Sequence, residues 1–414
     1  MTSKLWVFRD IDPDRRTALA RALSISPATA SLLLARGVTT PDEATAWMAP
    51  FPAHDPFLIP DIETAIDRLH YAVQHRERVC FYGDYDVDGM SATSIYYSFF
   101  RGLGANAQAY VPHRIREGYG LNEGAVRTLA AEGVKLLVTS DCGTTSHHEI
   151  AVANQLGMDV IVTDHHQTDE QMPEALAVMN PHRREARYPF RGLCSGGLAY
   201  KVADAYRQRY GQGTVALDSL LDLVALSTIA DVVPLQDENR GFVQEGLRQL
   251  SRGSRCGIRA LKQVAGVTRE CSAETVGFKL GPRLNAAGRL DHAIKGVQLL
   301  TTESESEAMQ LAQELEQLNR RRQDLEAEIM REAVAMLGEG DPPPAIVLAS
   351  RGWHLGVVGI VAARLMERFH RPAIVMAINE QGIGKGSART IPGFDLYQAL
   401  GACKDLLVAF GGHP

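Results

Sequence analysis

The stretch VCFYGDYDVDG, residues 79–89, places three carboxylates on alternate positions directly behind a short apolar run. The apolar run predicts a buried β-strand, and Asp84, Asp86 and Asp88 follow where that strand ends. The spacing D-x-D-x-D-G also begins an EF-hand calcium loop, but that loop needs a glutamate at its twelfth position, where this sequence has Ile95. Neighbouring carboxylates repel one another unless cations or hydrogen bonds compensate them, so further metal ligands are expected elsewhere in the chain.

The composition predicts a soluble protein of two or three domains. The chain has 414 residues, of which 45% are hydrophobic, and its net charge is −6. The sequence shows neither an apolar run long enough for a membrane span nor the apolar core of a signal peptide, so a cytoplasmic location without membrane attachment is expected. The cysteines form no C-x-x-C pair, which argues against a zinc knuckle and against a disulfide framework. The charge gives no overall basic signature for nucleic-acid binding, although local basic patches remain compatible with it.

Apolar periodicity predicts an α/β fold with two α/β domains joined by a long helix. From about 58 to 180, short apolar runs alternate with amphipathic stretches, which is typical of a doubly wound, mainly parallel sheet. We expect strands near 78–83, 106–111, 135–140, 159–163 and 175–179. Helical patterns dominate 195–300 and continue as one helix through 303–337, and a second α/β pattern follows the break at 338–345. The expected organisation is a helical region at 1–50, a larger domain at 51–300, a connecting helix at 301–340 and a smaller domain at 341–414.

Acidic and histidine side chains follow several of these apolar segments. Asp141 comes after KLLVTS, the triplet Asp164-His165-His166 after DVIVT, and Asp231 after LVALSTIA. Functional groups of an open α/β sheet gather beyond the C-terminal ends of its strands, so we expect these side chains to meet those behind the first strand. Carboxylates and neutral imidazoles suit Mn²⁺ or Mg²⁺. Two such ions about 4 Å apart form the arrangement that hydrolyses phosphoric anhydrides and diesters.

The local geometry of the first acidic stretch suggests how it could serve two ions. Alternate residues of an extended chain point to opposite sides, so Asp86 and Asp88 would serve different ions unless a turn redirects one of them. Gly89 is expected to let the chain turn sharply into a helix, and the N-terminal amides of that helix are expected to favour a phosphate oxygen.

Four segments resemble the motifs of the DHH phosphoesterases, namely GDYDVDG, TSDCG, VTDHH and IADVVPL. The segments GYGL, LCSGGLAYK, GPRLNAAGRLD, WHLGVVGIVAARL, GKGSARTIPGFDLY and FGGH resemble the RecJ exonucleases within that superfamily, over nearly the whole chain. The resemblance implies a catalytic DHH domain and a smaller DHHA1 domain that closes over the substrate. It also implies a metal-dependent exonuclease that degrades single-stranded DNA from its 5′ end to mononucleotides, in DNA repair and recombination.

The resemblance implies two metal positions with shared ligands. The implied ligands are Asp86, with Asp84 as a helper, for the first ion, Asp88, His165 and Asp231 for the second, and Asp141 as a bridge between both. His166 would lie beside the scissile phosphate, and Asp164 would orient the histidine pair. The sequence departs from some members of the superfamily at Tyr82, where they carry a histidine, and this bears on the occupancy of the first position.

The resemblance also implies a pocket for the 5′-terminal phosphate. Ser387 and Arg389 of the DHHA1 domain would surround this phosphate together with Arg114, because a guanidinium binds phosphate through two hydrogen bonds. Further implied substrate contacts are Arg283, Asn285, Arg289 and His413. A pocket that requires a free strand end would make the nuclease an exonuclease.

Chains of the RecJ type continue beyond the GGH motif into an OB-type domain that binds single strands, whereas this sequence stops at Pro414. A truncated chain with an incomplete DHHA1 domain is therefore expected, with weaker and more salt-sensitive binding. The family is expected to act as a monomer alongside a helicase and single-strand-binding protein. Two alternatives remain: a DHH phosphoesterase acting on short oligonucleotides, cyclic dinucleotides, pyrophosphate or polyphosphate, and a non-catalytic replication scaffold. The scaffold predicts missing metal ligands, and none is missing.

Overall fold

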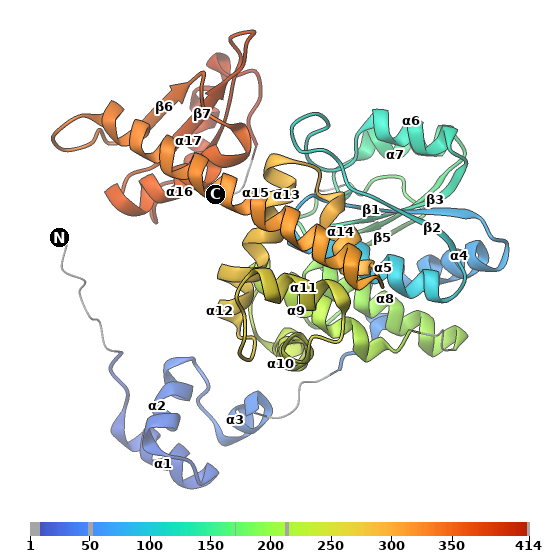
Figure 1. Cartoon of the computed structure of the whole chain (residues 1–414). Helices are drawn as coiled ribbons and strands as arrows, with labels where there is room; N and C mark the ends of the chain where they lie inside the picture. The colour runs from blue at the N-terminus through green and yellow to red at the C-terminus, as the bar shows by residue number, and fades with distance from the viewer. Residues whose placement is uncertain (1–8, 49–52, 170, 212–214, 412–414) are drawn as a thin grey trace.

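The computed structural model describes residues 9–48, 53–169, 171–211 and 215–411. Two α/β domains are joined by one long helix, and three short helices stand at the N-terminus (Figure 1). The predicted fold class is confirmed. Among the described residues, no single helix has the length and apolarity to cross a membrane, and the one pair of helices that qualifies together is bent by 115°.

The larger domain is built on a parallel sheet with the strand order β2-β1-β3-β4-β5. Its strands are β1 (Arg78–Gly83), β2 (Asn106–Tyr110), β3 (Val134–Ser140), β4 (Asp159–Thr163) and β5 (Ala177–Met179). All five lie where the apolar runs predict them. Because β1 pairs with β2 on one side and β3 on the other, the winding reverses between β1 and β3. Crevices at such a reversal are where open α/β sheets hold their functional groups.

Helices cover both faces of this sheet (Figure 1). One face carries α6 (Glu123–Ala131) and α7 (His147–Gln155), and the other carries η1 (Pro56–Leu58), α4 (Ile62–Gln74), α5 (Val87–Gly102) and α8 (Ser195–Tyr210). The alternation of side chains along β1 supplies both cores, since Phe81 packs with the α5 side while Cys80 and Tyr82 pack with the α6 side. A strand that is buried on both faces has a continuous apolar sequence, which is why VCFYG predicts a buried strand.

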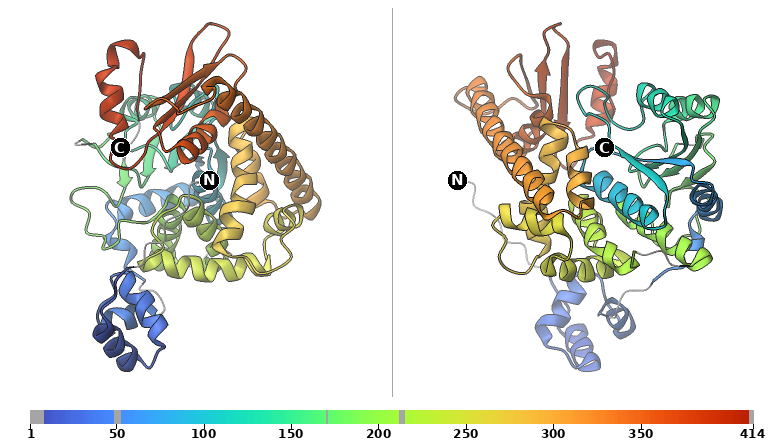
Figure 2. Two further views of the ribbon diagram at one scale, coloured as in Figure 1. Left: turned by 90° about the vertical axis from the view of Figure 1, so that its left-hand side faces the viewer. Right: turned by 45° about the vertical axis from the view of Figure 1, so that its right-hand side comes forward.

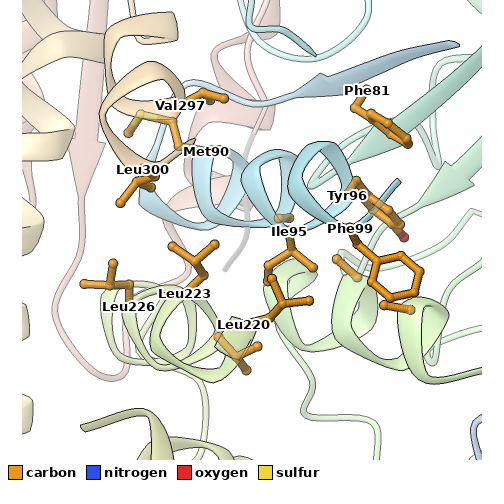
Figure 3. Packing of buried hydrophobic residues seen from close by; sticks show 14 of the residues in the cluster. Phe81, Met90, Ile95, Tyr96, Phe99, Leu220, Leu223, Leu226, Val297 and Leu300 are labelled. Atoms are coloured by element: carbon orange, nitrogen blue, oxygen red, sulfur yellow. The ribbon is translucent and has the colours of Figure 1, made fainter. Parts of the chain in front are cut away.

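A set of helices after β5 completes the larger domain. They are η2 (Leu217–Leu220), α9 (Leu221–Ala230), α10 (Asp237–Arg252), α11 (Cys256–Val264), α12 (Ala273–Thr275), the π-helical turn η3 (Val276–Leu280), α13 (Gly281–Leu290) and α14 (Ile294–Thr301). Of these, α9, α13 and α14 pack against α5, which is buried along most of its length. Figure 3 shows Met90 beside Val297 and Leu300 at one end of α5 and Phe99 at the other. The acids at the start of α5 are therefore held on a helix packed on several sides.

The connecting helix α15 (Glu305–Leu337) has 33 residues, about 50 Å at 1.5 Å per residue. Leu311 and Leu315 lie in the core of the larger domain, whereas Ile329 and Ala333 lie in the core of the smaller one. The smaller domain contains β6 (Ile346–Ser350), α16 (Leu355–Phe369), β7 (Ala373–Ile378), β8 (Gly384–Arg389), α17 (Leu396–Ala402) and η4 (Lys404–Leu406). In its sheet β6 and β7 are parallel and β8 is antiparallel. A single helix thus belongs to both cores and sets their relative placement.

The N-terminal helices α1 (Pro13–Leu23), α2 (Pro27–Ala35) and α3 (Pro41–Met48) form a small core of their own. Figure 2 shows them at the opposite end of the molecule from the C-terminal sheet. Side-chain caps begin α2 and α3. Ser26 accepts a hydrogen bond from the Thr29 amide, and Glu43 accepts one from the Thr40 amide at 3.1 Å while its own amide donates to the Thr40 hydroxyl.

Candidate metal centre and adjoining cleft

The acidic stretch after β1 begins α5 in a way that corrects one prediction. Asp86 is the N-cap of α5, and its Oδ1 accepts hydrogen bonds from the amides of Asp88 (2.8 Å) and Gly89 (3.2 Å). The helix begins at Val87, so the prediction that Gly89 turns the chain into it is wrong. A Cβ at Gly89 would lie 2.6 Å from the backbone nitrogen of Asp84. A glycine is required there because the helix start passes close to the end of β1.

The first amides of α5 are also not available to a phosphate, so this second prediction is wrong as well. Those of Asp88 and Gly89 are bonded to Asp86, and that of Val87 donates to Oδ1 of Asn285 at 3.2 Å. The amides at the start of α5 therefore already have side-chain hydrogen-bond acceptors within the protein. The structure therefore places Asn285, an implied substrate contact, where it supports the helix that carries two predicted metal ligands.

The predicted metal ligands converge at the edge of the sheet where β1 and β3 end. Three groups of side chains could each hold a metal ion. Within each group, the ligand atoms lie within 4.8 Å of one another. The groups are Asp84, Asp86 and Asp141; Asp88, His165 and Asp231; and Asp141, His165 and His166. Because the third group shares members with the other two, the arrangement forms one continuous cluster. Which side chain binds which ion stays a prediction.

His165 and Asp141 occupy the middle of this cluster. Nε2 of His165 lies 3.1 Å from Asp141 Oδ1, 3.4 Å from Asp88 Oδ2 and 3.6 Å from Asp231 Oδ2. Asp141 has a φ of 65°, in the left-handed region, which aspartate tolerates better than most residues. Its amide donates to the carbonyl of Thr163 at 3.1 Å, so the end of β4 holds this turn in place. Strained backbone that its surroundings enforce is common at functional sites.

The surrounding protein compensates the negative charge of the cluster only in part. Burial and the charge of Asp86 raise the pKa of Asp84 well above its usual range, and burial and the charge of Asp88 do the same for the pKa of Asp141. Burial and the charges of Asp88 and Asp86 raise the pKa of Asp231 to about 8. Asp231 is also the C-cap of α9, where the helix dipole disfavours an anion.

The donor set fits divalent cations. The buried Oδ1 of Asp84 has no hydrogen-bond partner within the described part of the chain. An unpaired buried carboxylate oxygen is costly, and a cation is the compensation that also relieves the neighbouring carboxylates. Mainly carboxylate oxygens with imidazole suit Mn²⁺ and Mg²⁺ rather than a thiolate-preferring metal.

Asp164 ties the histidine pair to the sheet. Its Oδ1 accepts from the amide of His165 at 2.8 Å and lies 2.7 Å from Nδ1 of His166, while its Oδ2 accepts from the amide of Thr144 at 3.1 Å. Burial disfavours a charged imidazole, but the hydrogen bond and charge of Asp164 outweigh it and raise the pKa of His166 to about 9. His166 is therefore a cation at neutral pH, and Asp164 makes the contacts that an orienting role requires.

A cleft of about 470 Å³ adjoins the cluster, between the two domains. It is lined by Tyr85, Arg114, Gly118, Tyr119 and Arg289 of the larger domain, by Leu355, Val358, Gly359, Ile360 and Ala363 of α16, and by Lys385, Gly386, Ser387 and Arg389 of β8. Tyr85 lies between two of the predicted ligands in sequence, so the cleft opens directly beside the acidic cluster. Four cationic side chains thus line a cleft next to a site built of carboxylates.

Three arginines of the cleft contact an aromatic ring, a hydroxyl and a backbone carbonyl. The guanidinium of Arg114 stacks over the ring of Tyr85 at 4.7 Å, and that of Arg389 donates to the Ser387 hydroxyl at 2.9 Å. Arg289 donates to the carbonyl of Gly356 at 3.1 Å. Burial and the charge of Arg114 lower the pKa of Arg289 to about 10. An arginine whose pKa is lowered by the charge of a neighbouring arginine favours an anionic ligand between the two.

A larger cavity of about 710 Å³ lies elsewhere, at the C-terminal end of α5. Its lining includes Arg255, whose Nε pairs with Asp222 at 3.0 Å and whose other nitrogens donate to the carbonyls of Leu300 and Ser219. This arginine already satisfies the nearby helix ends. The smaller cleft is therefore the one that adjoins the candidate metal site.

Both α/β domains match known protein families. Residues 78–228 match the DHH family, N-terminal domain, and residues 342–414 match the DHHA1 domain. The chain is 43% identical, over its whole length, to the single-stranded-DNA-specific exonuclease RecJ of Bacillus subtilis (strain 168), and it spans 53% of that protein. A crystal structure of exonuclease RecJ bound to manganese is 35% identical, with a TM-score of 0.75, over 88% of this chain and 90% of that one. The chain belongs to the RecJ family.

A further RecJ crystal structure, of the Thermus thermophilus protein in complex with Mn²⁺, shares 32% identity with a TM-score of 0.84. This similarity covers 97% of the present chain and 57% of the Thermus chain. The family resemblance read from the motifs is therefore confirmed, and it extends through both domains and the connecting helix.

Three other residues singled out in the sequence lie away from the RecJ-family site or outside the described part of the chain. Nε of Arg283 pairs with Glu316 of α15 at 2.6 Å, and Arg283 is not among the residues that line the cleft. His413 lies outside the described residues. Tyr82 is buried on the α6 side of the sheet, where its hydroxyl donates to the carbonyl of Gly120 at 2.9 Å.

Sequence reasoning missed three residues that the RecJ-family fold brings to the site. The hydroxyl of Tyr119 donates to the carbonyl of Asp141 at 3.0 Å, and Lys385 lines the cleft. Ser195 contacts two of the predicted ligands. All three lie in segments that carry the RecJ resemblance, GYGL, GKGSAR and LCSGGLAYK, but a hydroxyl contact with a residue distant in sequence leaves no pattern in the sequence itself.

Chelation of divalent cations is expected to lower the melting temperature of this chain, and more at pH 8 than at pH 5. Asp84, Asp141 and Asp231 have raised pKa values, so the folded state binds their protons more tightly than the unfolded state does. Without cations, stability therefore falls as the pH rises from about 4, the ordinary carboxyl pKa, towards the raised values. Thermal unfolding with EDTA or Mn²⁺ across this range measures the difference. Equal losses at pH 5 and pH 8 would contradict the expectation.

Proposed function

We propose that this chain is a metal-dependent exonuclease that removes mononucleotides from the 5′ end of single-stranded DNA, in DNA repair and recombination. The observation that carries the proposal is the position of the basic interdomain cleft directly beside the converged acidic cluster. The names of the RecJ relatives support the strand specificity. Since the chain spans about half of the Bacillus protein, the activity of the present chain is the quantity to be tested.

The proposed cofactors are two Mn²⁺ or Mg²⁺ ions, supported by the manganese in related RecJ crystals. The residues proposed to hold them are Asp84, Asp86, Asp88, Asp141, His165 and Asp231. When bound, the ions would supply an activated water nucleophile and stabilise the charge that develops on the phosphate. Within each group of these ligands the atoms already lie within 4.8 Å of one another.

His166 is proposed to act on the scissile phosphate. One of its ring nitrogens is bonded to Asp164, which leaves the other free to donate a hydrogen bond to a phosphate oxygen. The hydrogen bond and charge of Asp164 raise the pKa of this ring, and a hydrogen bond from the protonated ring to the phosphate is charge-assisted and strengthens as negative charge grows there. The hydroxyl of Tyr119 lies 3.4 Å from Nδ1 of the same ring.

The cleft is proposed to bind the 5′-terminal phosphate. Arg114 and Arg389 come from different domains and meet in the same cleft, together with Ser387. Guanidinium groups bind phosphate through paired hydrogen bonds, and a terminal phosphate has more free oxygens than an internal one. Holding a strand end at a fixed distance from the acidic cluster would make cleavage start at that end. A helicase and a single-strand-binding protein as partners, action as a monomer, and a cytoplasmic location belong to the same proposal.

The proposal is tested with 5′-labelled single strands, 3′-labelled single strands and blunt duplexes, each with Mn²⁺ or with EDTA. We expect Mn²⁺-dependent release of labelled mononucleotide from the 5′-labelled single strand first. Equal rates on duplex would contradict the strand preference. Pyrophosphate, cyclic dinucleotides and dinucleotides are included, because faster turnover of any of these would assign the site to another DHH phosphoesterase activity.

A further inference from the structure

The N-terminal turn of α8 lies against the acidic cluster. The amide of Ser195 donates to Oδ2 of Asp88 at 2.9 Å, and the amide of Gly196 donates to Oδ1 of the same carboxylate at 3.0 Å. The hydroxyl of Ser227, on α9, donates to that Oδ1 as well. Ser195 and Ser227 are fully buried. Asp88 is therefore held by donors from two helices before any cation is considered.

Ser195 makes a second contact that links two parts of the cluster. Its hydroxyl donates to Oδ1 of Asp141 at 3.1 Å. Asp88 belongs to the group with His165 and Asp231, whereas Asp141 belongs to the group with the acids behind β1. One residue thus bonds a carboxylate of each group, through its backbone to one and through its side chain to the other.

The close approach of α8 depends on the glycine that follows. A Cβ at Gly196 would lie 2.6 Å from Cβ of Ser227 and 3.7 Å from Oδ1 of Asp88. At Gly197, one position further along the helix, a Cβ would instead meet the movable end of the Leu193 side chain at 3.2 Å. The close approach of α8 to Ser227 and Asp88 therefore requires a glycine at position 196 but not at position 197.

We infer that Ser195 is a positioning residue that fixes Asp88 relative to Asp141 and so sets the spacing of the two metal positions. The inference rests on the proposed function, because it gives the two groups of acids the role of two cation positions. α8 is 16 residues long and packs in the main core, so its first turn is a rigid reference for both carboxylates. Residues that orient metal ligands typically change metal affinity by about 10–100-fold when they are replaced.

The test is calorimetric titration of the whole metal-free chain with Mn²⁺. Ser195→Ala loses the hydroxyl donor to Asp141, and we expect at least one of two Mn²⁺ ions to bind at least about tenfold more weakly than in the unaltered chain. Ser94→Ala is the matched control, since Ser94 is equally buried but its hydroxyl donates to the carbonyl of Met90 within α5. Both variants lose one buried hydroxyl, so thermal unfolding in EDTA shows whether they lose similar stability. Equal Mn²⁺ binding by the two variants would overturn the inference.

A second pair of variants tests the same contact without altering Ser195. Gly196→Ala is expected to displace Ser227 from Asp88 and to lower the affinity for one Mn²⁺ ion. Gly197→Ala is expected to bind both ions with normal affinity. Equal effects in this pair would also overturn the inference. If the unaltered chain binds two Mn²⁺ ions and shows the expected loss in Ser195→Ala, but hydrolyses no DNA strand, the proposed activity fails and the positioning role stands. Absence of Mn²⁺ binding by the unaltered chain overturns the positioning role.

Discussion

Asp141→Asn is expected to lower the rate of strand hydrolysis by roughly a thousandfold or more, while stabilising the metal-free chain. Asp141 belongs to the group with Asp84 and Asp86, and its Oδ1 lies 3.1 Å from Nε2 of His165 in the other group, so its loss is expected to affect both proposed cation positions. Asparagine has the same shape and tolerates the left-handed backbone at this position, where φ is 65°. The variant therefore removes charge without removing the turn. Removing one of several buried like charges also relieves their repulsion, which is why stability in EDTA should rise.

The measurement combines initial rates on a 5′-labelled single strand with thermal unfolding in EDTA. Asp159→Asn is a matched control, because Asp159 is at the opposite end of β4 and pairs with Arg68. The control should keep the full rate and should not gain stability. If Asp141→Asn retained normal hydrolysis, the proposed role of the acidic cluster would be wrong. If it lost both activity and stability in EDTA, the carboxylate would be a structural group rather than part of a cluster whose charge is only partly compensated.

Arg389→Ala is expected to lower kcat/KM for 5′-phosphorylated single strands by about 10–100-fold, with little effect on strands that begin with a 5′-hydroxyl. Arg389 donates to Ser387, and both line the cleft with Arg114. A hydrogen bond between a guanidinium and a phosphate is stronger than a neutral one, and the lost interaction exists only with the phosphorylated end. The ratio of rates on the two kinds of strand therefore reports the contribution of the terminal phosphate separately from the hydrolysis step.

Arg351→Ala is the control for this experiment, since Arg351 is an exposed arginine of the same domain that directly follows β6. It carries the same charge change on the same surface but does not line the cleft. It should leave the ratio for phosphorylated and unphosphorylated ends unchanged. A similar loss on both kinds of strand in Arg389→Ala would show that Arg389 supports general strand binding, and the terminal-phosphate pocket would have to be placed elsewhere.

Much of the fold was predictable because buried parallel strands read as continuous apolar runs. The runs at VCFYG and KLLVTS became β1 and β3, and the acids behind them meet because these two strands are neighbours. The leucine spacing of 303–337 likewise predicts α15. Periodicity and the acids behind the strand ends therefore predict the convergence of side chains that the structure shows.

The errors lie where local sequence has several structural solutions. Gly89 follows acids and looks like a turn, but close packing against Asp84 decides its role. The first amides of α5 could bind a phosphate in isolation, yet Asp86 and Asn285 occupy them. The substrate contact of Arg283 stays a prediction, and in the structure this arginine pairs with Glu316, 33 positions away in the chain. Such partners depend on the packing of distant helices, which no local pattern encodes.

The most direct test of the metal centre is anomalous scattering from crystals soaked in Mn²⁺, recorded at the manganese edge. We expect two adjacent peaks where β1, β3 and β4 end. One should lie among Asp84, Asp86 and Asp141, and the other among Asp88, His165 and Asp231. No peak at this convergence, or peaks only at other surfaces of the chain, would contradict the two-cation site from which the proposed function is derived.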